Sequence, residues 1–142
     1  IPINFSFNGD SRGIYVVEEG FNSEFLERRG KKVGPIFSLN EPMGEVFPSV
    51  VYEPYEAKKI NSDNEIIYDN ARRKLLSIKS EYKNNNFDPS LYFDLRQWAT
   101  FFSVIDLVGS YHGAVPKSVK LYFNPSTQLF EPVFFDNHLG GR

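Results

Sequence analysis

Apolar and polar residues alternate at the start of the chain. The alternating apolar positions are Ile3, Phe5 and Phe7. The turn-like stretch NGDSRG follows, and residues 14–17 are apolar again. A period of two is typical of strands, and the pair Asn8-Gly9 accepts the positive φ angles of a tight turn. The pattern predicts an N-terminal β-hairpin in which NGDSRG forms the turn.

Two later segments have the period of an amphipathic helix. In the first, Asp63 or Asn64 is the expected cap, residues 84–86 mark the end, and the apolar positions are Ile67, Ala71, Leu75, Ile78 and Tyr82. In the second, Asp94 is the expected cap, Gly109 the end, and the apolar face contains Trp98, Phe101, Phe102, Ile105 and Val108. We expect both faces to belong to the core.

The segment between the first hairpin and these helices is less regular. Asn22 or Ser23 is the expected cap of a short helix over residues 24–29. Four prolines lie between residues 31 and 57, where we expect a mostly irregular, ordered loop with one short strand around residues 36–39.

A second hairpin is predicted near the other end of the chain. The stretches SVKLYF and LFEPVFF have strand composition, NPSTQ separates them, and the apolar run ends at Asp136. Together the segments predict an α+β fold. The 142 residues suit a single domain, residues 1–142, and a 41% hydrophobic content allows a sizeable core. Because the chain begins without methionine and inside a strand pattern, we expect it to lack upstream strands of a larger domain.

Composition narrows the classes of partner. Sixteen basic and eighteen acidic residues give a net charge of −2, so we expect no nucleic-acid partner. No uncharged apolar run approaches the roughly 20 residues that cross a bilayer, so we expect no membrane span. The chain contains no cysteine, which excludes disulfides and cysteine-ligated zinc. Oligomeric state and compartment stay open.

Three residues around the last hairpin are candidates for chemistry. His112 precedes its first strand, and Asp136 and His138 follow its second. A hairpin brings such positions together, and imidazole and carboxylate groups are common ligands of divalent metals. The alternative is that each histidine bonds to a loop carbonyl and Asp136 caps a turn.

Three segments, in order, resemble the spore coat protein H (CotH) kinase-like family. They are FNGDSRGIYVVEEGFNSEFLERRG, YFDLRQWATFFSVIDLVGS and KLYFNPSTQLFEPVFFD. In the first segment the matching positions are Gly13, Ile14, Tyr15 and Glu19. The resemblance covers most of the chain and is weaker over residues 31–61.

This resemblance implies an atypical protein-kinase-like fold, present in part, and phosphoryl transfer from ATP with Mg²⁺ (or Mn²⁺) to a protein hydroxyl. Asp136 falls on the family's metal-binding aspartate. Glu19 is implied to pair with a phosphate-binding lysine. The family also favours an extracellular or cell-surface location, with a surface or coat protein as the partner.

The departures from the family pattern leave alternatives open. His112 stands nearest the catalytic aspartate, Lys117 or Ser118 replaces an asparagine, and His138 replaces a second aspartate. Histidine can serve as a general base. The same changes also fit an inactive pseudokinase that acts as a binding or structural module. A site made of His112, Asp136 and His138 would instead suit Mn²⁺, Fe²⁺ or Zn²⁺ in a metal-dependent enzyme of another class.

The basic residues near these motifs have two interpretations. Arg28, Arg29, Lys117 and Lys120 could contact phosphate, with Lys117 as the candidate cofactor-binding residue. Charged residues on short elements are more often solvated, which is the interpretation we favour for all four, with Lys117 kept as the cofactor-binding candidate.

Overall fold

The computed structural model of this chain describes residues 2–17, 20–40, 51–54, 62–115 and 118–135. Within these ranges it contains two antiparallel sheets and three α-helices, which confirms the α+β class. No helix in these ranges is both long enough and apolar enough to cross a membrane.

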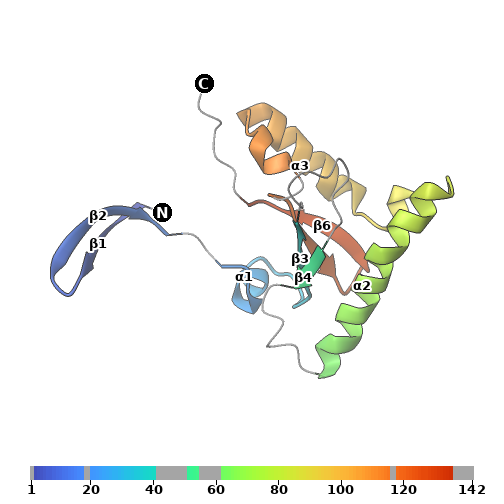
Figure 1. Cartoon of the computed structure of the whole chain (residues 1–142), viewed down its shortest axis with the longest axis horizontal. Helices are drawn as coiled ribbons and strands as arrows, with labels where there is room; N and C mark the ends of the chain where they lie inside the picture. The colour runs from blue at the N-terminus through green and yellow to red at the C-terminus, as the bar shows by residue number, and fades with distance from the viewer. Residues whose placement is uncertain (1, 18–19, 41–50, 55–61, 116–117, 136–142) are drawn as a thin grey trace.

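The predicted N-terminal hairpin is present. Strand β1 (Pro2–Phe7) pairs with β2 (Asp10–Val16). The turn is shorter than expected: Asn8 and Gly9 have φ angles of 52° and 88°, and β2 already begins at Asp10. Two successive positive φ angles match the twist of the strands, so two residues suffice to close the hairpin. Figure 1 shows this hairpin extending away from the four-stranded sheet and the helices.

The second sheet has the strand order β4-β3-β5-β6, and all neighbouring strands are antiparallel. Its strands are β3 (Ile36–Asn40), β4 (Val51–Pro54), β5 (Lys120–Asn124) and β6 (Leu129–Val133). The β5–β6 hairpin was predicted. The expected short strand around residues 36–39 is confirmed as β3, whereas β4, which pairs with it, was not predicted. Pro54 ends an edge strand, where proline is tolerated.

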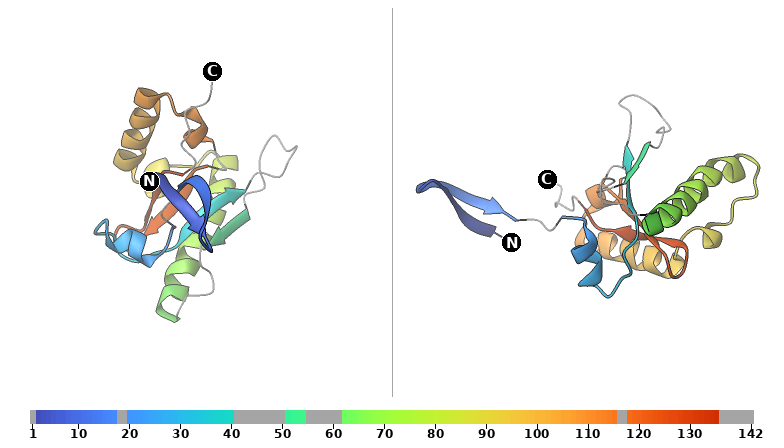
Figure 2. Two further views of the ribbon diagram at one scale, coloured as in Figure 1. Left: turned by 90° about the vertical axis from the view of Figure 1, so that its left-hand side faces the viewer. Right: turned by 90° about the horizontal axis from the view of Figure 1, so that it is seen from below.

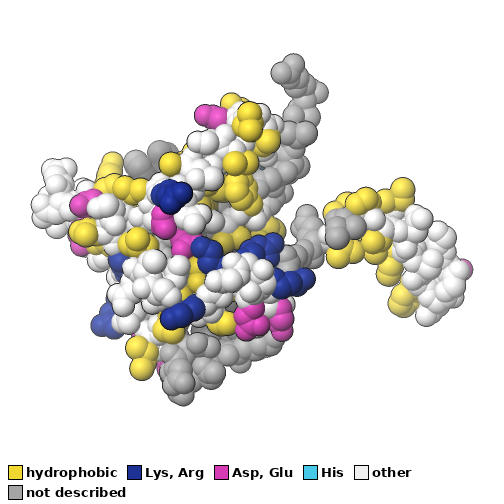
Figure 3. Space-filling view, turned by 180° about the vertical axis from the view of Figure 1, so that it is seen from behind, with side chains coloured by type: hydrophobic (Ala, Val, Ile, Leu, Met, Phe, Trp, Pro, Cys, Tyr) yellow, Lys and Arg dark blue, Asp and Glu magenta, His cyan; other side chains and the backbone are white. Residues whose placement is uncertain are grey.

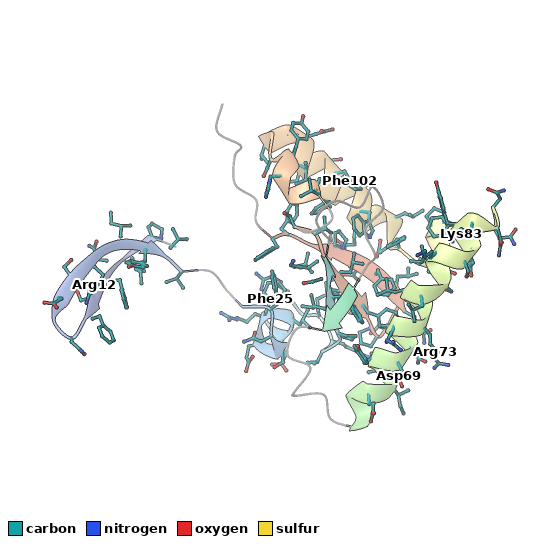
Figure 4. The ribbon with its side chains drawn as sticks, in the orientation of Figure 1. Arg12, Phe25, Asp69, Arg73, Lys83 and Phe102 are labelled. Carbon is teal, nitrogen blue, oxygen red and sulfur yellow. The ribbon has the colours of Figure 1, made fainter. Side chains whose placement is uncertain are left out.

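Helices α2 (Ser62–Lys83) and α3 (Leu95–Val108) cover one face of this sheet. Their buried contacts with β3, β5 and β6 form the main core, which confirms the predicted role of most apolar helix positions. The buried core residues are Phe37, Ala71, Leu75, Phe101, Ile105, Val119, Leu121, Phe123 and Phe130. Three predicted core positions are instead exposed: Tyr82 on α2, and Phe102 and Val108 on α3. Figure 4 labels Phe102 on α3.

The ends of the helices follow local sequence. The Asp94 side chain accepts a hydrogen bond from the Gln97 backbone N–H at 3.1 Å, and Gly109 has a φ angle of 66°. Both agree with the predicted cap and end of α3. Helix α2 begins at Ser62, so the expected caps Asp63 and Asn64 lie inside the helix.

The short helix α1 (Ser23–Glu27) covers the opposite face of the sheet (Figure 2). The Asn22 side chain caps it by accepting a hydrogen bond from the Phe25 N–H at 2.9 Å. Its buried side chains, Phe25 and Leu26, pack on Ile36 and Tyr122. The sheet therefore separates a large core from a smaller one, and the smaller one borders the candidate site.

Candidate functional site

Most of the predicted site residues lie outside the described residues. This is so for Glu19, Lys117, Asp136 and His138. The predicted metal pair, Asp136 and His138, and the predicted phosphate contacts are therefore hypotheses. Within the described ranges, no group of three or more His, Asp or Glu side chains is arranged to hold a metal ion.

His112 is the one predicted site residue whose position is described. It lies half-buried in the 3₁₀ turn η3 (Tyr111–Ala114), which follows α3. The turn begins after Ser110, a buried residue whose hydroxyl makes no hydrogen bond within the described part of the chain. Buried hydroxyl groups usually make a hydrogen bond, so the Ser110 hydroxyl is unusual at this position beside the core.

The loop that contains η3 leads to the end of the sheet where β6 finishes. The first residue of β5, Lys120, is paired in register with Val133, the last residue of β6. Beyond β6, Phe134 packs on Phe101 with ring centroids 4.5 Å apart, and Phe135 packs on Phe21 at 5.5 Å. The residues directly before Asp136 are thus held by contacts on both faces of the sheet.

Lys120 is buried at this end of the sheet. Its exposed fraction is 4%, and its Nζ atom lies 4.5 Å from the centroid of the Phe135 ring. The expectation that Lys120 is solvated was therefore wrong. Its side chain shares the α1 side of β5 with Tyr122, since residues two apart on a strand face the same way. A cation over an aromatic ring is favourable in such a desolvated position.

An open pocket of about 280 Å³ lies on the same side, between α1 and β6. Its lining combines apolar side chains with basic, amide and carboxylate groups. The lining residues are Phe25, Leu26, Arg29, Lys31, Gln97, Tyr122, Glu131, Pro132, Val133 and Phe134. Figure 3 shows basic side chains gathered on one face of the molecule with apolar and acidic ones between them.

Arg29 is fixed at the pocket by two contacts with Phe25. Its Nη1 donates to the Phe25 carbonyl oxygen at 2.9 Å, and its Cζ lies 3.8 Å from the centroid of the Phe25 ring. Arg29 is exposed, which agrees with the solvated interpretation, and its guanidinium group also stacks on the Phe25 ring. The neighbouring Arg28 is exposed, as expected, and its Nε donates to the Glu24 carbonyl oxygen at 3.4 Å.

Glu131 is the buried carboxylate of the pocket. Its Oε2 lies 2.7 Å from Lys31 Nζ, and its Oε1 accepts from Asn124 Nδ2 at 2.7 Å. Nearby, the Tyr122 hydroxyl donates to the Lys32 carbonyl oxygen at 2.7 Å. Burial, and secondly the negative charge of Glu131, raise the pKa of Tyr122 well above its usual range.

These contacts bring charged side chains of both signs together on the α1 side of the sheet. The basic side chains of Arg29, Lys31 and Lys120 come from the end of α1, the following loop and β5. Among the described residues that line the pocket, Glu131 is the one carboxylate. This cluster was not predicted from the sequence. The spacing of two residues between Lys120 and Tyr122 in a predicted strand does indicate that their side chains share one face of the sheet.

No protein-family model matches this chain, and a search of curated proteins also finds no match. The resemblance to the CotH kinase-like family therefore rests on the three sequence segments alone. Any activity assigned on that basis is a proposal.

Proposed function

We propose that this chain binds ATP together with a divalent metal, Mg²⁺ or Mn²⁺, and transfers a phosphoryl group to the hydroxyl of a partner protein. The observation that supports it best is the buried ammonium group of Lys120 beside Phe135, the residue that directly precedes Asp136. Phosphoryl transfer requires fixed cations and a metal-holding carboxylate, and Asp136 follows Phe135 directly in the sequence.

Each residue has a distinct role in this proposal. Asp136 holds the metal ion, with His138 as a second ligand, and Lys120 and Lys117 compensate the charge of the phosphates. Glu19 orients a phosphate-binding cation. His112 accepts the proton that the acceptor hydroxyl loses as its oxygen bonds to phosphorus, while the bond from phosphorus to ADP breaks.

The test is calorimetric titration of the protein with ATP in the presence of Mg²⁺ and then of Mn²⁺. We expect metal-dependent binding that Asp136→Ala abolishes and that Lys120→Met weakens by about tenfold, because a charge is removed without loss of volume. Lys79→Met is the matched control, since Lys79 is exposed on α2. Unchanged metal-dependent binding in Asp136→Ala would overturn the metal-holding assignment.

A catalytically inactive binding module is the second candidate. One observation favours it: Ser118, which with Lys117 is one of the two residues that could replace the family's asparagine before the hairpin, is 1% exposed. Its neutral hydroxyl supplies no negative charge to hold Mg²⁺, which is usually bound through carboxylates and phosphates. This candidate predicts no heat of binding with ATP and either metal, whereas a transfer enzyme must bind both.

A further inference from the structure

The N-terminal hairpin exposes apolar side chains. Every residue of β1 and β2 is exposed, and no other described strand pairs with either of them. Ile3, Phe5 and Phe7 share one face of β1, and the Phe5 ring packs on Tyr15 of β2 with ring centroids 5.1 Å apart. Figure 3 shows apolar side chains at the surface of this hairpin. A hairpin of two strands is at best marginally stable in water, whereas three or more strands with an apolar face can be stable.

The two outer edges of the hairpin differ. Strand β2 carries Asp10 and Arg12, and its register against β1 shifts so that Arg12 has no opposite residue on β1. The next residue, Gly13, has a φ angle of 88°. Charged residues and bulges protect a strand edge from pairing with another chain. Strand β1, with the sequence PINFSF, has neither a charge nor an extra residue, so its edge is the one suited to pairing.

The sequence of β1 is complementary to itself. In an antiparallel pair the outward backbone groups of the two strands must meet, so side chains of the same face lie opposite each other. When Phe5 lies opposite Phe5 of a second copy, Ile3 lies opposite Phe7 on the same face. On the other face Asn4 lies opposite Ser6. Apolar residues then meet apolar ones and polar residues meet polar ones, and the uncharged strand has no charge that would select a charged partner instead.

We propose that two copies of this chain associate by antiparallel pairing of their β1 edges, with Phe5 on the two-fold axis. The product is a four-stranded sheet of order β2-β1-β1-β2, whose interface is the same on both copies. Pro2, which has no amide hydrogen, stays outside the paired stretch. The charged, bulged β2 edges lie on the outside, so growth ends at the dimer. This association does not depend on the proposed phosphoryl transfer.

Sedimentation velocity of the full chain at about 1 to 100 µM measures this association. We expect a reversible, concentration-dependent change from a monomer to a species of twice its mass. Phe5→Lys should weaken the association by about tenfold or more, because it places like charges directly opposite each other and removes the apolar pair. Ile14→Lys is the matched control: it adds the same charge to an exposed position of β2, outside the paired edge, and the affinity should stay within about twofold.

Cysteine cross-linking tests the register, since the chain has no cysteine of its own. Phe5→Cys should form a disulfide between copies under mild oxidation, because the two opposed Cα atoms lie about 4.5–5.5 Å apart. Ile3→Cys alone should not, since its two copies lie four residues apart along the strands, about 14 Å. An equimolar mixture of Ile3→Cys and Phe7→Cys should cross-link again. Denaturant midpoints of all the variants establish that each is folded.

Three results would overturn the proposal. One is a monomer at every concentration, and another is equally tight association of Phe5→Lys and Ile14→Lys. The third is cross-linking of Ile3→Cys as fast as that of Phe5→Cys, which would show that the contact has no fixed register. Species larger than a dimer would contradict the protection assigned to the β2 edge and, with it, the closed two-fold pairing.

Discussion

On the α1 side of the sheet, the buried polar residues need hydrogen-bond or ion-pair partners within the protein. Glu131 is 5% exposed, and both of its carboxylate oxygens have partners, Lys31 and Asn124. A buried carboxylate without such partners would be strongly destabilising. The ion pair and the hydrogen bond of Glu131 therefore hold the loop after α1, which contains Lys31, against β5 and β6.

Because of Tyr122, the stability of the folded chain depends on pH. Its pKa is raised, so the folded chain retains a proton that the unfolded chain releases above pH about 10. Stability from this group is complete below pH 10 and is lost as the pH rises above it, by up to about 1.4 kcal/mol per pH unit. Urea unfolding at pH 8, 10 and 11 measures this slope.

Tyr122→Phe is the variant that isolates the effect. It should cost about 1 kcal/mol at pH 8, because the hydrogen bond to the Lys32 carbonyl oxygen is lost. Above pH 10 the variant should lose less stability than the unchanged protein. Some slope will persist, since the pKa of Tyr92 is also raised, first by its hydrogen bond with Glu81. Equal slopes in the two proteins would contradict this account of Tyr122.

At the scale of elements, those defined by local chemistry could be predicted from the sequence. Asp94 and Gly109 define the ends of α3, and Asn8-Gly9 closes the first hairpin, through interactions within a few residues. Strand β4 could not be predicted, because β3 stabilises it by pairing and its own four residues carry little pattern. The exposure of Phe102 depends likewise on which elements pack around α3.

The two sheets should respond differently to loss of an aromatic side chain. Phe130→Ala should cost about 3–5 kcal/mol, because Phe130 is fully buried in the main core. Phe5→Ala should cost about 1 kcal/mol or less, since Phe5 is 39% exposed and its ring contact is with Tyr15 in the same hairpin. Urea unfolding followed by far-ultraviolet circular dichroism gives both values. A similar cost for both variants would show that the hairpin contributes to the main cooperative unit.

For the whole molecule, the sequence motifs predict a site whose position stays a prediction, because Asp136 and His138 lie outside the described residues. They directed attention to the end of the last hairpin, where Lys120 and Val133 are paired. They did not identify Arg29, Lys31 or Glu131 as one cluster. These residues lie on α1's end, a loop and β6, and only the packing of α1 against the sheet brings them together.

Thermal unfolding distinguishes the proposed nucleotide site from a transition-metal site. A ligand that binds only the folded chain stabilises it by about 2.7 kcal/mol at 100 times its Kd. For a chain of this size that raises the midpoint by about 5–10 °C. We expect this rise with ATP and Mg²⁺ together, and none with Zn²⁺ or Mn²⁺ alone. Asp136→Ala should remove the rise, whereas the control Asp106→Ala, on an exposed position of α3, should keep it. A rise with Zn²⁺ alone that His112→Ala abolishes would instead identify a metal site that includes His112, and the nucleotide proposal would then be wrong.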